Sequence, residues 1–118
     1  MKNSKMSTEI RPWGKYSIIT EKPSFKIKRI EVNINQRLSY QFHNYRAETW
    51  IIIQGDGKIT IDDVTTDCSK GDTLVIPIGS KHRIQNTGNR KLVFIEVQTG
   101  SYFGEDDIVR IEDDYNRH

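Results

Sequence analysis

Apolar and polar residues alternate along short stretches of this chain, and residues typical of turns separate those stretches. Alternation with a period of two places every second side chain on one face, as in a half-buried β-strand, and no stretch keeps a helical period. The pattern predicts strands over residues 15–21, 25–34, 38–43, 47–54, 58–62, 65–68, 73–76, 82–86 and 91–98. About nine short strands with closely spaced turns predict an all-β antiparallel sandwich or barrel.

Two local features of this pattern predict how strands bend and pair. Phe25 and Ile27 share one strand face, whereas Ile30, Val32 and Ile34 lie on the other, which predicts a β-bulge near Arg29. The Gly-Asp-Gly turn at 55–57 separates two β runs, so residues 47–54 and 58–62 are expected to form a hairpin.

Four side chains in two segments have the chemistry of metal ligands: Gln41, His43, Glu48 and His82. Gln41 and His43 lie two residues apart on a predicted strand and therefore point to the same face. Glu48 begins the next strand and His82 follows a Pro/Gly turn, so strand pairing is able to bring all four to one point. Two imidazoles, a carboxylate and an amide oxygen suit Zn²⁺ or another divalent transition metal, such as iron, manganese or nickel.

Length and composition predict one soluble domain. The chain has 118 residues, of which 35% are hydrophobic and 29% charged, with a formal net charge of +2. We expect a flexible N-terminus over residues 1–10 and a single domain over 11–118. Acidic and basic residues are interspersed, so we expect no nucleic-acid partner.

The expected location is the cytoplasm. The N-terminal residues contain no apolar run of signal-peptide length, and nowhere do ~18 apolar residues follow one another, so we expect no membrane association. The single cysteine, Cys68, excludes an internal disulfide and fits a reducing compartment.

The two segments that hold the candidate ligands resemble the two motifs of the cupin superfamily, which consists of small β-barrels with an internal metal. The second motif reads Gly, five residues, Pro, one, Gly, two, His, three, Asn, and residues 71–86 contain it whole. The first reads Gly, five, His, one, His, three or four, Glu, six, Gly, and residues 35–55 match it with Asn35 for the first Gly and Gln41 for the first His. Because Asn tolerates a left-handed backbone, we expect the turn at Asn35 to be kept.

Gln at the first His position and the surrounding residues resemble the type II phosphomannose isomerase family. The shared segments are RPWG at 11–14, LSYQFH at 38–43, RAETW at 46–50, IEVQTG at 95–100 and GEDDIVR at 104–110. This resemblance implies a cupin double-stranded β-helix, or jelly-roll barrel, in which residues 101–118 pack as a final strand or a short helix. Many members of that family carry a nucleotidyltransferase domain ahead of this module, but no Gly-rich phosphate loop precedes it here, so we expect no guanylyltransferase activity.

The resemblance implies a metal-dependent isomerase that interconverts mannose 6-phosphate and fructose 6-phosphate. Arg46 and Arg110 lie inside the shared segments and are candidates for holding the phosphate, with Arg110 counted among the catalytic residues. Lys28 and Tyr45 are further candidates for substrate contacts. Tyr45 stands where many relatives have His. If the Glu96 face of its strand lines the cavity, Glu96 is the candidate general base; a surface salt bridge is the alternative.

Two other functions fit the same residues. One is a non-catalytic module that binds a sugar or sugar phosphate, and the other is a cupin isomerase of a different sugar. The expected partner is a small-molecule sugar phosphate. We also expect a homodimer, because small cupins commonly pair through sheet edges that are otherwise unprotected.

Overall fold

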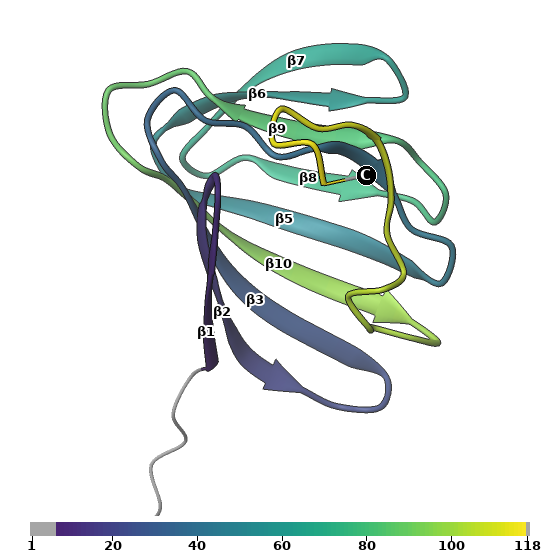
Figure 1. The fold of residues 1–118 in the computed structure, drawn as a ribbon. Coiled ribbons are helices and arrows are strands. Elements are labelled where there is room, and N and C mark those ends of the chain that lie inside the picture. Colours follow the sequence, from purple (N-terminus) through teal and green to yellow (C-terminus); the bar gives the residue numbers. More distant parts are fainter. Residues whose placement is uncertain (1–6, 118) are drawn as a thin grey trace, which may run out of the picture.

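Two antiparallel β-sheets pack face to face in the computed structural model, which describes residues 7–117 (Figure 1). The six-stranded sheet has the order β1 (Ser7–Arg11), β2 (Gly14–Glu21), β3 (Phe25–Val32), β10 (Leu92–Gly100), β5 (Arg46–Gln54) and β8 (Thr73–Ile76). The five-stranded sheet has the order β11 (Val109–Glu112), β4 (Tyr40–Phe42), β9 (His82–Asn86), β6 (Asp56–Ile61) and β7 (Val64–Ser69). The predicted all-β antiparallel class is confirmed, and the described residues include no helix.

A continuous apolar core fills the space between the sheets. Trp50 of β5 stacks on Phe94 of β10 with ring centroids 4.5 Å apart, and Ile59 and Ile84 contribute from the opposite sheet. Each of these four side chains is at most 1% exposed. Burying a large apolar side chain contributes roughly 1.5–3 kcal/mol, so this cluster holds the two sheets together.

The C-terminal segment crosses from one sheet to the other. After β10, the chain (yellow in Figure 1) runs to the five-stranded sheet, where β11 pairs with β4 and places Arg110 opposite Gln41. Of the two forms expected for residues 101–118, the strand is therefore present. This connection covers one opening of the sandwich and brings the end of the chain beside the predicted metal ligands.

The predicted hairpin between residues 47–54 and 58–62 is wrong. β5 pairs with β10 and β8, whereas β6 pairs with β7 and β9, so the chain changes sheets at Gly55, whose φ is 92°. Both runs are apolar on the face that meets the core, and they pack across the core instead of side by side. The true hairpin joins β6 to β7 through Asp62 and Asp63, both with positive φ, as a two-residue turn requires.

The bulge predicted near Arg29 is also wrong. β3 pairs with β10 without a register shift, and its interior face begins with the buried Lys26 and Lys28 before the apolar residues. A shift occurs instead in the neighbouring β2, between Ile18 and Thr20. The apolar pattern changed phase because two lysines, not apolar residues, point inward.

The N-terminal prediction is only partly within the described residues. Residues 1–6 of the flexible segment expected over 1–10 lie outside them. The remainder does not form a loose end, because Ser7–Arg11 is strand β1 and pairs with β2 over its whole length. No helix in the described part of the chain is long and apolar enough to span a membrane.

Candidate metal centre

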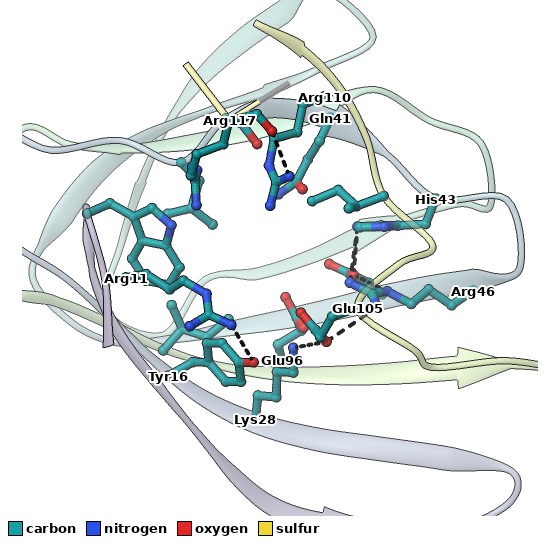
Figure 2. A pocket seen from close by; sticks show the side chains of 16 residues that line it. Arg11, Tyr16, Lys28, Gln41, His43, Arg46, Glu96, Glu105, Arg110 and Arg117 are labelled. Atoms are coloured by element: carbon teal, nitrogen blue, oxygen red, sulfur yellow. Dashed lines mark hydrogen bonds and ion pairs between the residues drawn. The ribbon is translucent and has the colours of Figure 1, made fainter. Parts of the chain in front are cut away.

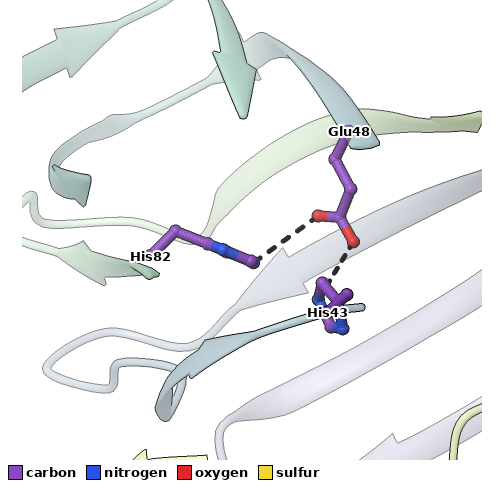
Figure 3. A group of neighbouring side chains, drawn as sticks. All are labelled: His43, Glu48 and His82. Atoms are coloured by element: carbon purple, nitrogen blue, oxygen red, sulfur yellow. Dashed lines mark ion pairs between the residues drawn. The ribbon is translucent and has the colours of Figure 1, made fainter. Parts of the chain in front are cut away.

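Three of the four predicted ligands converge between the sheets (Figure 3). His43 follows β4, Glu48 lies on β5 and His82 begins β9, and one ligand atom from each lies within 4.8 Å of the other two. All three side chains are buried. Gln41, the fourth, is on β4 directly opposite His82 in the strand register, and its side chain is also buried.

Backbone carbonyls fix the orientation of both imidazoles. The Nδ1 atom of His43 lies 2.7 Å from the carbonyl oxygen of Asp107, and Nδ1 of His82 lies 2.9 Å from that of Ser80. A carbonyl only accepts hydrogen bonds, so Nδ1 carries the proton in each ring and Nε2 presents a lone pair. The two Nε2 atoms lie 3.2 Å and 3.8 Å from oxygens of Glu48.

Two polar atoms at this point are buried without a hydrogen-bond partner: Oε1 of Gln41 and Nε2 of His82. A buried polar atom left without a partner costs about 1–3 kcal/mol, so such atoms need an explanation. Ligands about 2.0–2.1 Å from a shared Zn²⁺ lie roughly 3 Å or slightly more from one another, which is close to the separations seen here. The donor set therefore fits a divalent transition metal.

The Glu48 carboxylate is held in its charged form. Trp50 donates a hydrogen bond of 2.9 Å to one oxygen, and Nε of Arg46 donates one of 2.8 Å to the other. Burial alone would raise the pKa of Glu48, but the contacts with His43, His82 and Arg46 outweigh it and hold the pKa well below its ordinary value. An ionised carboxylate is the form that binds a metal.

A cavity adjoins these ligands and is lined by many ionisable side chains (Figure 2). Its lining includes Gln41, His43 and Glu48, and also the predicted Lys28, Arg46, Glu96 and Arg110. The sequence did not reveal which face of β10 points inward. In the structure the face that bears Glu96 and Gln98 points inward.

Glu96 is a buried carboxyl group inside this cavity. The side-chain amide of Gln98 donates a 2.5 Å hydrogen bond to its Oε2. Burial, followed by the nearby negative charge of Glu48, raises the pKa of Glu96 to about 7. Of the two roles left open by the sequence, a surface salt bridge does not fit this position.

Comparison with known proteins identifies the family. Residues 2–113 match the family model described as mannose-6-phosphate isomerase C-terminal. The chain belongs to this family. The resemblance noted from the sequence is thereby confirmed.

Relatives of this mannose-6-phosphate isomerase C-terminal domain are much longer proteins. Over 107 residues it is 47% identical to the alginate biosynthesis protein AlgA of Pseudomonas aeruginosa, matching 91% of this chain and 22% of AlgA. It is 40% identical to a mannose-1-phosphate guanylyltransferase of Klebsiella pneumoniae, again over 91% of this chain and 23% of the relative. The chain thus spans under a quarter of the length of these relatives.

Solved structures confirm the cupin double-stranded β-helix. CapF, a capsular polysaccharide assembling protein of Staphylococcus aureus, superimposes with a TM-score of 0.79 at 18% identity, over 93% of this chain and 35% of CapF. The oxalate decarboxylase of Lactobacillus farciminis gives 0.77 at 23% identity, over 90% and 33% of the two chains. A protein from Klebsiella pneumoniae described as having a double-stranded β-helix domain gives 0.73 at 19% identity, over 82% and 78%. At these identities the likeness shows the fold alone.

The candidate substrate residues of this domain differ in where they lie. Lys28 is buried in the cavity, 2.7 Å from Glu105 and 4.1 Å above the ring of Tyr16. Arg46 contacts Glu48 and lies 3.3 Å from Nε2 of His43, so its guanidinium belongs beside the metal ligands. Tyr45 does not line the cavity; it is 54% exposed and packs edge-on against Tyr102.

Tyr45 points away because β4 ends at Phe42. The strand alternation that would have placed Tyr45 on the face of His43 stops there, and β5 begins at Arg46. The amide nitrogen of Tyr45 is held by the carboxylate of Asp107, 3.0 Å away. A tight connection therefore separates Tyr45 from the ligand that precedes it by two residues.

Sequence reasoning missed several residues that line the cavity: Arg11, Tyr16, Glu105 and Arg117. Arg11 and Glu105 lie inside two of the segments shared with the isomerase family, RPWG and GEDDIVR, and that is the signal that could have identified them. Tyr16 and Arg117 carried no such signal. They reach the cavity because β2 and the described residues after β11 border it.

Proposed function

We propose that this chain is a metal-dependent aldose–ketose isomerase that interconverts mannose 6-phosphate and fructose 6-phosphate. The observation that carries the proposal is the convergence of His43, Glu48 and His82, with Gln41 opposite His82 in the strand register, at a cavity that also holds a buried carboxyl group and several cations. Nε2 of His82 and Oε1 of Gln41 have no hydrogen-bond partner. The family description and the sugar-phosphate enzyme names of relatives support the same substrate class.

Gln41, His43, Glu48 and His82 would hold the metal, which we propose to be Zn²⁺ or another divalent transition metal. Such an ion, when bound, supplies Lewis acidity that polarises a substrate carbonyl. Arg46, which donates to Glu48 and lies next to His43, fixes the position of these ligands and adds positive charge beside the reacting oxygens.

Glu96 is the proposed general base. Its carboxylate removes the proton from C2 of the open-chain aldose and returns it to C1, while a hydroxyl proton passes from O2 to O1. Position is the reason for this choice, because Glu96 is a buried carboxyl group that lines the cavity beside Glu48 and is not among the proposed metal ligands. Lys28 and Glu105 form an ion pair at the same end, and Arg110 contributes a cation for the phosphate group.

The test is a coupled assay with mannose 6-phosphate together with elemental analysis of the purified protein. We expect turnover that a chelator abolishes and that added metal restores. His82→Ala and Gln41→Ala should lose bound metal and activity, whereas Gln85→Ala, on β9 with a partly exposed side chain, should keep both. Binding of mannose 6-phosphate by the metal-loaded wild type without turnover would overturn the isomerase proposal in favour of a binding module.

A further inference from the structure

The cavity has an acidic side and a purely cationic side (Figure 2). The carboxylates that line it are Glu48, Glu96 and Glu105, which lie with Arg46 and Lys28. Arg11, Arg110 and Arg117 lie around the remaining rim, and no carboxylate that lines the cavity forms an ion pair with them. The part of the rim that runs from Arg11, beside Tyr16, to Arg117 and Arg110, across the cavity from Glu96, is therefore positively charged.

Arg110 has the least satisfied guanidinium of the three. Its Nε is buried without a hydrogen-bond partner, and one terminal nitrogen donates to the backbone carbonyl of Arg117 at 3.2 Å. No carboxylate in residues 7–117 makes an ion pair with it. Burial and the positive charge of Arg117 both lower the pKa of Arg110, which means that its cation is disfavoured where it stands.

Arg11 and Arg117 keep donors free for a ligand. Arg117 binds Asp113 through Nε at 2.9 Å and Nη2 at 3.1 Å, and its Nη1 makes no hydrogen bond to the described residues. Arg11 donates from Nη2 to the hydroxyl of Tyr16 at 3.2 Å and from Nη1 to the carbonyl oxygen of Ile10 at 3.0 Å, and its ion pair with the half-exposed Glu9 is loose, 3.6 Å, so its Nε is left for a ligand. Three like charges around one opening are stabilised best by a multivalent anion, and guanidinium groups bind phosphate through paired donors.

We propose that Arg11, Arg110 and Arg117 together bind the phosphomonoester dianion of the substrate, and that this anion ties the two ends of the chain to each other. The identification of the ligand as a sugar phosphate rests on the proposed function. Arg11 ends β1, whereas Arg110 and Arg117 belong to β11 and the residues after it, nearly the full length of the chain away. A phosphate shared by them is a bridge between the six-stranded and five-stranded sheets at the cavity rim.

The first test measures binding of inorganic phosphate, which needs no turnover, by isothermal titration calorimetry on the whole chain. Arg11→Gln and Arg117→Gln should each weaken phosphate binding at least tenfold, and neutral mannose should bind all variants alike. Arg90→Gln removes the same charge from an exposed turn away from the cavity and should bind phosphate as the wild type does. Arg117→Gln also removes the contacts with Asp113 and could therefore disturb the fold. Arg11→Gln breaks only partly exposed contacts, so a loss of phosphate binding in this variant is due to the site and not to misfolding.

The second test measures amide hydrogen exchange with and without saturating inorganic phosphate. Exchange should slow in residues 7–11 and in 109–117 together, and this joint protection should disappear in Arg11→Gln. Phosphate binding that is equal in Arg11→Gln, Arg117→Gln and Arg90→Gln, or protection confined to one end, would overturn the proposal. If the site binds phosphate as expected but mannose 6-phosphate is not turned over, the isomerase proposal fails while the arginine site stands.

Discussion

Asp107 holds the loop that carries the ligand His43. Its carbonyl oxygen accepts the Nδ1 proton of His43, and its carboxylate accepts the backbone N–H groups of Asn44 at 2.9 Å and Tyr45 at 3.0 Å. One residue from the segment after β10 thus fixes both the ring orientation and the backbone that bears it. Partners of this kind commonly change metal affinity by 10- to 100-fold when they are removed.

We therefore expect Asp107→Ala to weaken metal binding by about 10- to 100-fold, because the loop of His43 loses its anchor. Competition with a chromophoric chelator measures the affinity, and circular dichroism shows whether the sheets persist. Asp106→Ala, at the neighbouring exposed position, is the matched control and should bind metal as the wild type does. Equal affinities in the two variants would show that Asp107 does not position His43.

Asp113 makes the C-terminal residues sensitive to acid. Burial alone would raise its pKa, but hydrogen bonds from the Arg117 side chain and from the amides of Arg117 and Tyr115 lower the pKa to about 2 from 3.8. A carboxyl group whose pKa is lower in the folded state than in the unfolded state stabilises the fold at pH values above its unfolded-state pKa. This contribution, here about 2 kcal/mol, is lost as the pH falls towards the folded-state pKa. We expect the protection factors of the amides in residues 113–117, taken relative to the intrinsic exchange rate at each pH, to fall between about pH 4 and pH 2. Asp113→Asn should show low protection factors already at pH 6; wild-type protection factors that do not change with pH would contradict this account.

At the level of single residues, the sequence predicts what motif spacing and backbone preference encode. Three of the four candidate ligands converge and Gln41 lies opposite one of them, and Asn35 takes the left-handed backbone expected of it, with φ 64°. Tyr45 was placed by strand alternation, which fails where a strand ends after three residues. The position of Arg117 at the cavity could not be predicted, because no pattern in the surrounding sequence indicates that this arginine makes a tertiary contact.

At the level of elements, the change of sheet at Gly55 explains the failed hairpin prediction. A Gly-rich turn between two β runs is the usual signal for side-by-side pairing. Here the positive φ of Gly55 turns β6 into the opposite sheet, and a Cβ at this position would lie 2.9 Å from the carbonyl oxygen of Lys91 and 3.1 Å from Cα of Leu92. The local signal for a turn is the same in both cases; the core contacts between distant strands decide which partner is chosen.

Gly55→Ala is expected to lower the free energy of unfolding by about 3 kcal/mol, from the left-handed backbone and the backbone collision together. Gly71→Ala separates these two terms, because Gly71 has φ 94° but no atom within 4 Å of an added Cβ. It should cost about 1–2 kcal/mol. Urea unfolding of the two variants checks the difference. Equal losses would mean that the close approach to Lys91 does not constrain the crossing.

At the level of the whole molecule, the homodimer remains a prediction, and the edge strand β8 is the surface through which we expect it to form. Among the described strands, β8 pairs only with β5; Val75 on it is 64% exposed, and Ile51 and Ile53 of β5 are exposed as well. A sheet edge next to apolar side chains favours association. Light scattering after size exclusion should give twice the chain mass of 13.8 kDa, and Val75→Lys should reduce it to the mass of one chain. A wild type with the mass of a single chain would contradict the dimer.

The proposed metal would also join the two sheets. Gln41 and His82 come from strands of the five-stranded sheet and Glu48 from the six-stranded sheet, so one ion would bind residues of both. A ligand that binds only the folded state stabilises it by RT ln(1 + [L]/Kd), about 2.7 kcal/mol at a hundredfold excess over Kd. For a chain of this size that raises Tm by roughly 10 °C.

We therefore expect Zn²⁺ to raise the Tm of the metal-free protein by roughly 10 °C, and a chelator to reverse the change. His82→Ala should have a Tm that no longer depends on Zn²⁺, whereas Gln85→Ala should respond like the wild type, because its side chain is not a proposed ligand. Differential scanning calorimetry of the three proteins makes the comparison. If the Tm of His82→Ala rises with Zn²⁺ as much as that of the wild type, the ion binds at another site. If the Tm of the wild type does not change with Zn²⁺, the proposed metal neither stabilises the fold nor takes part in the reaction.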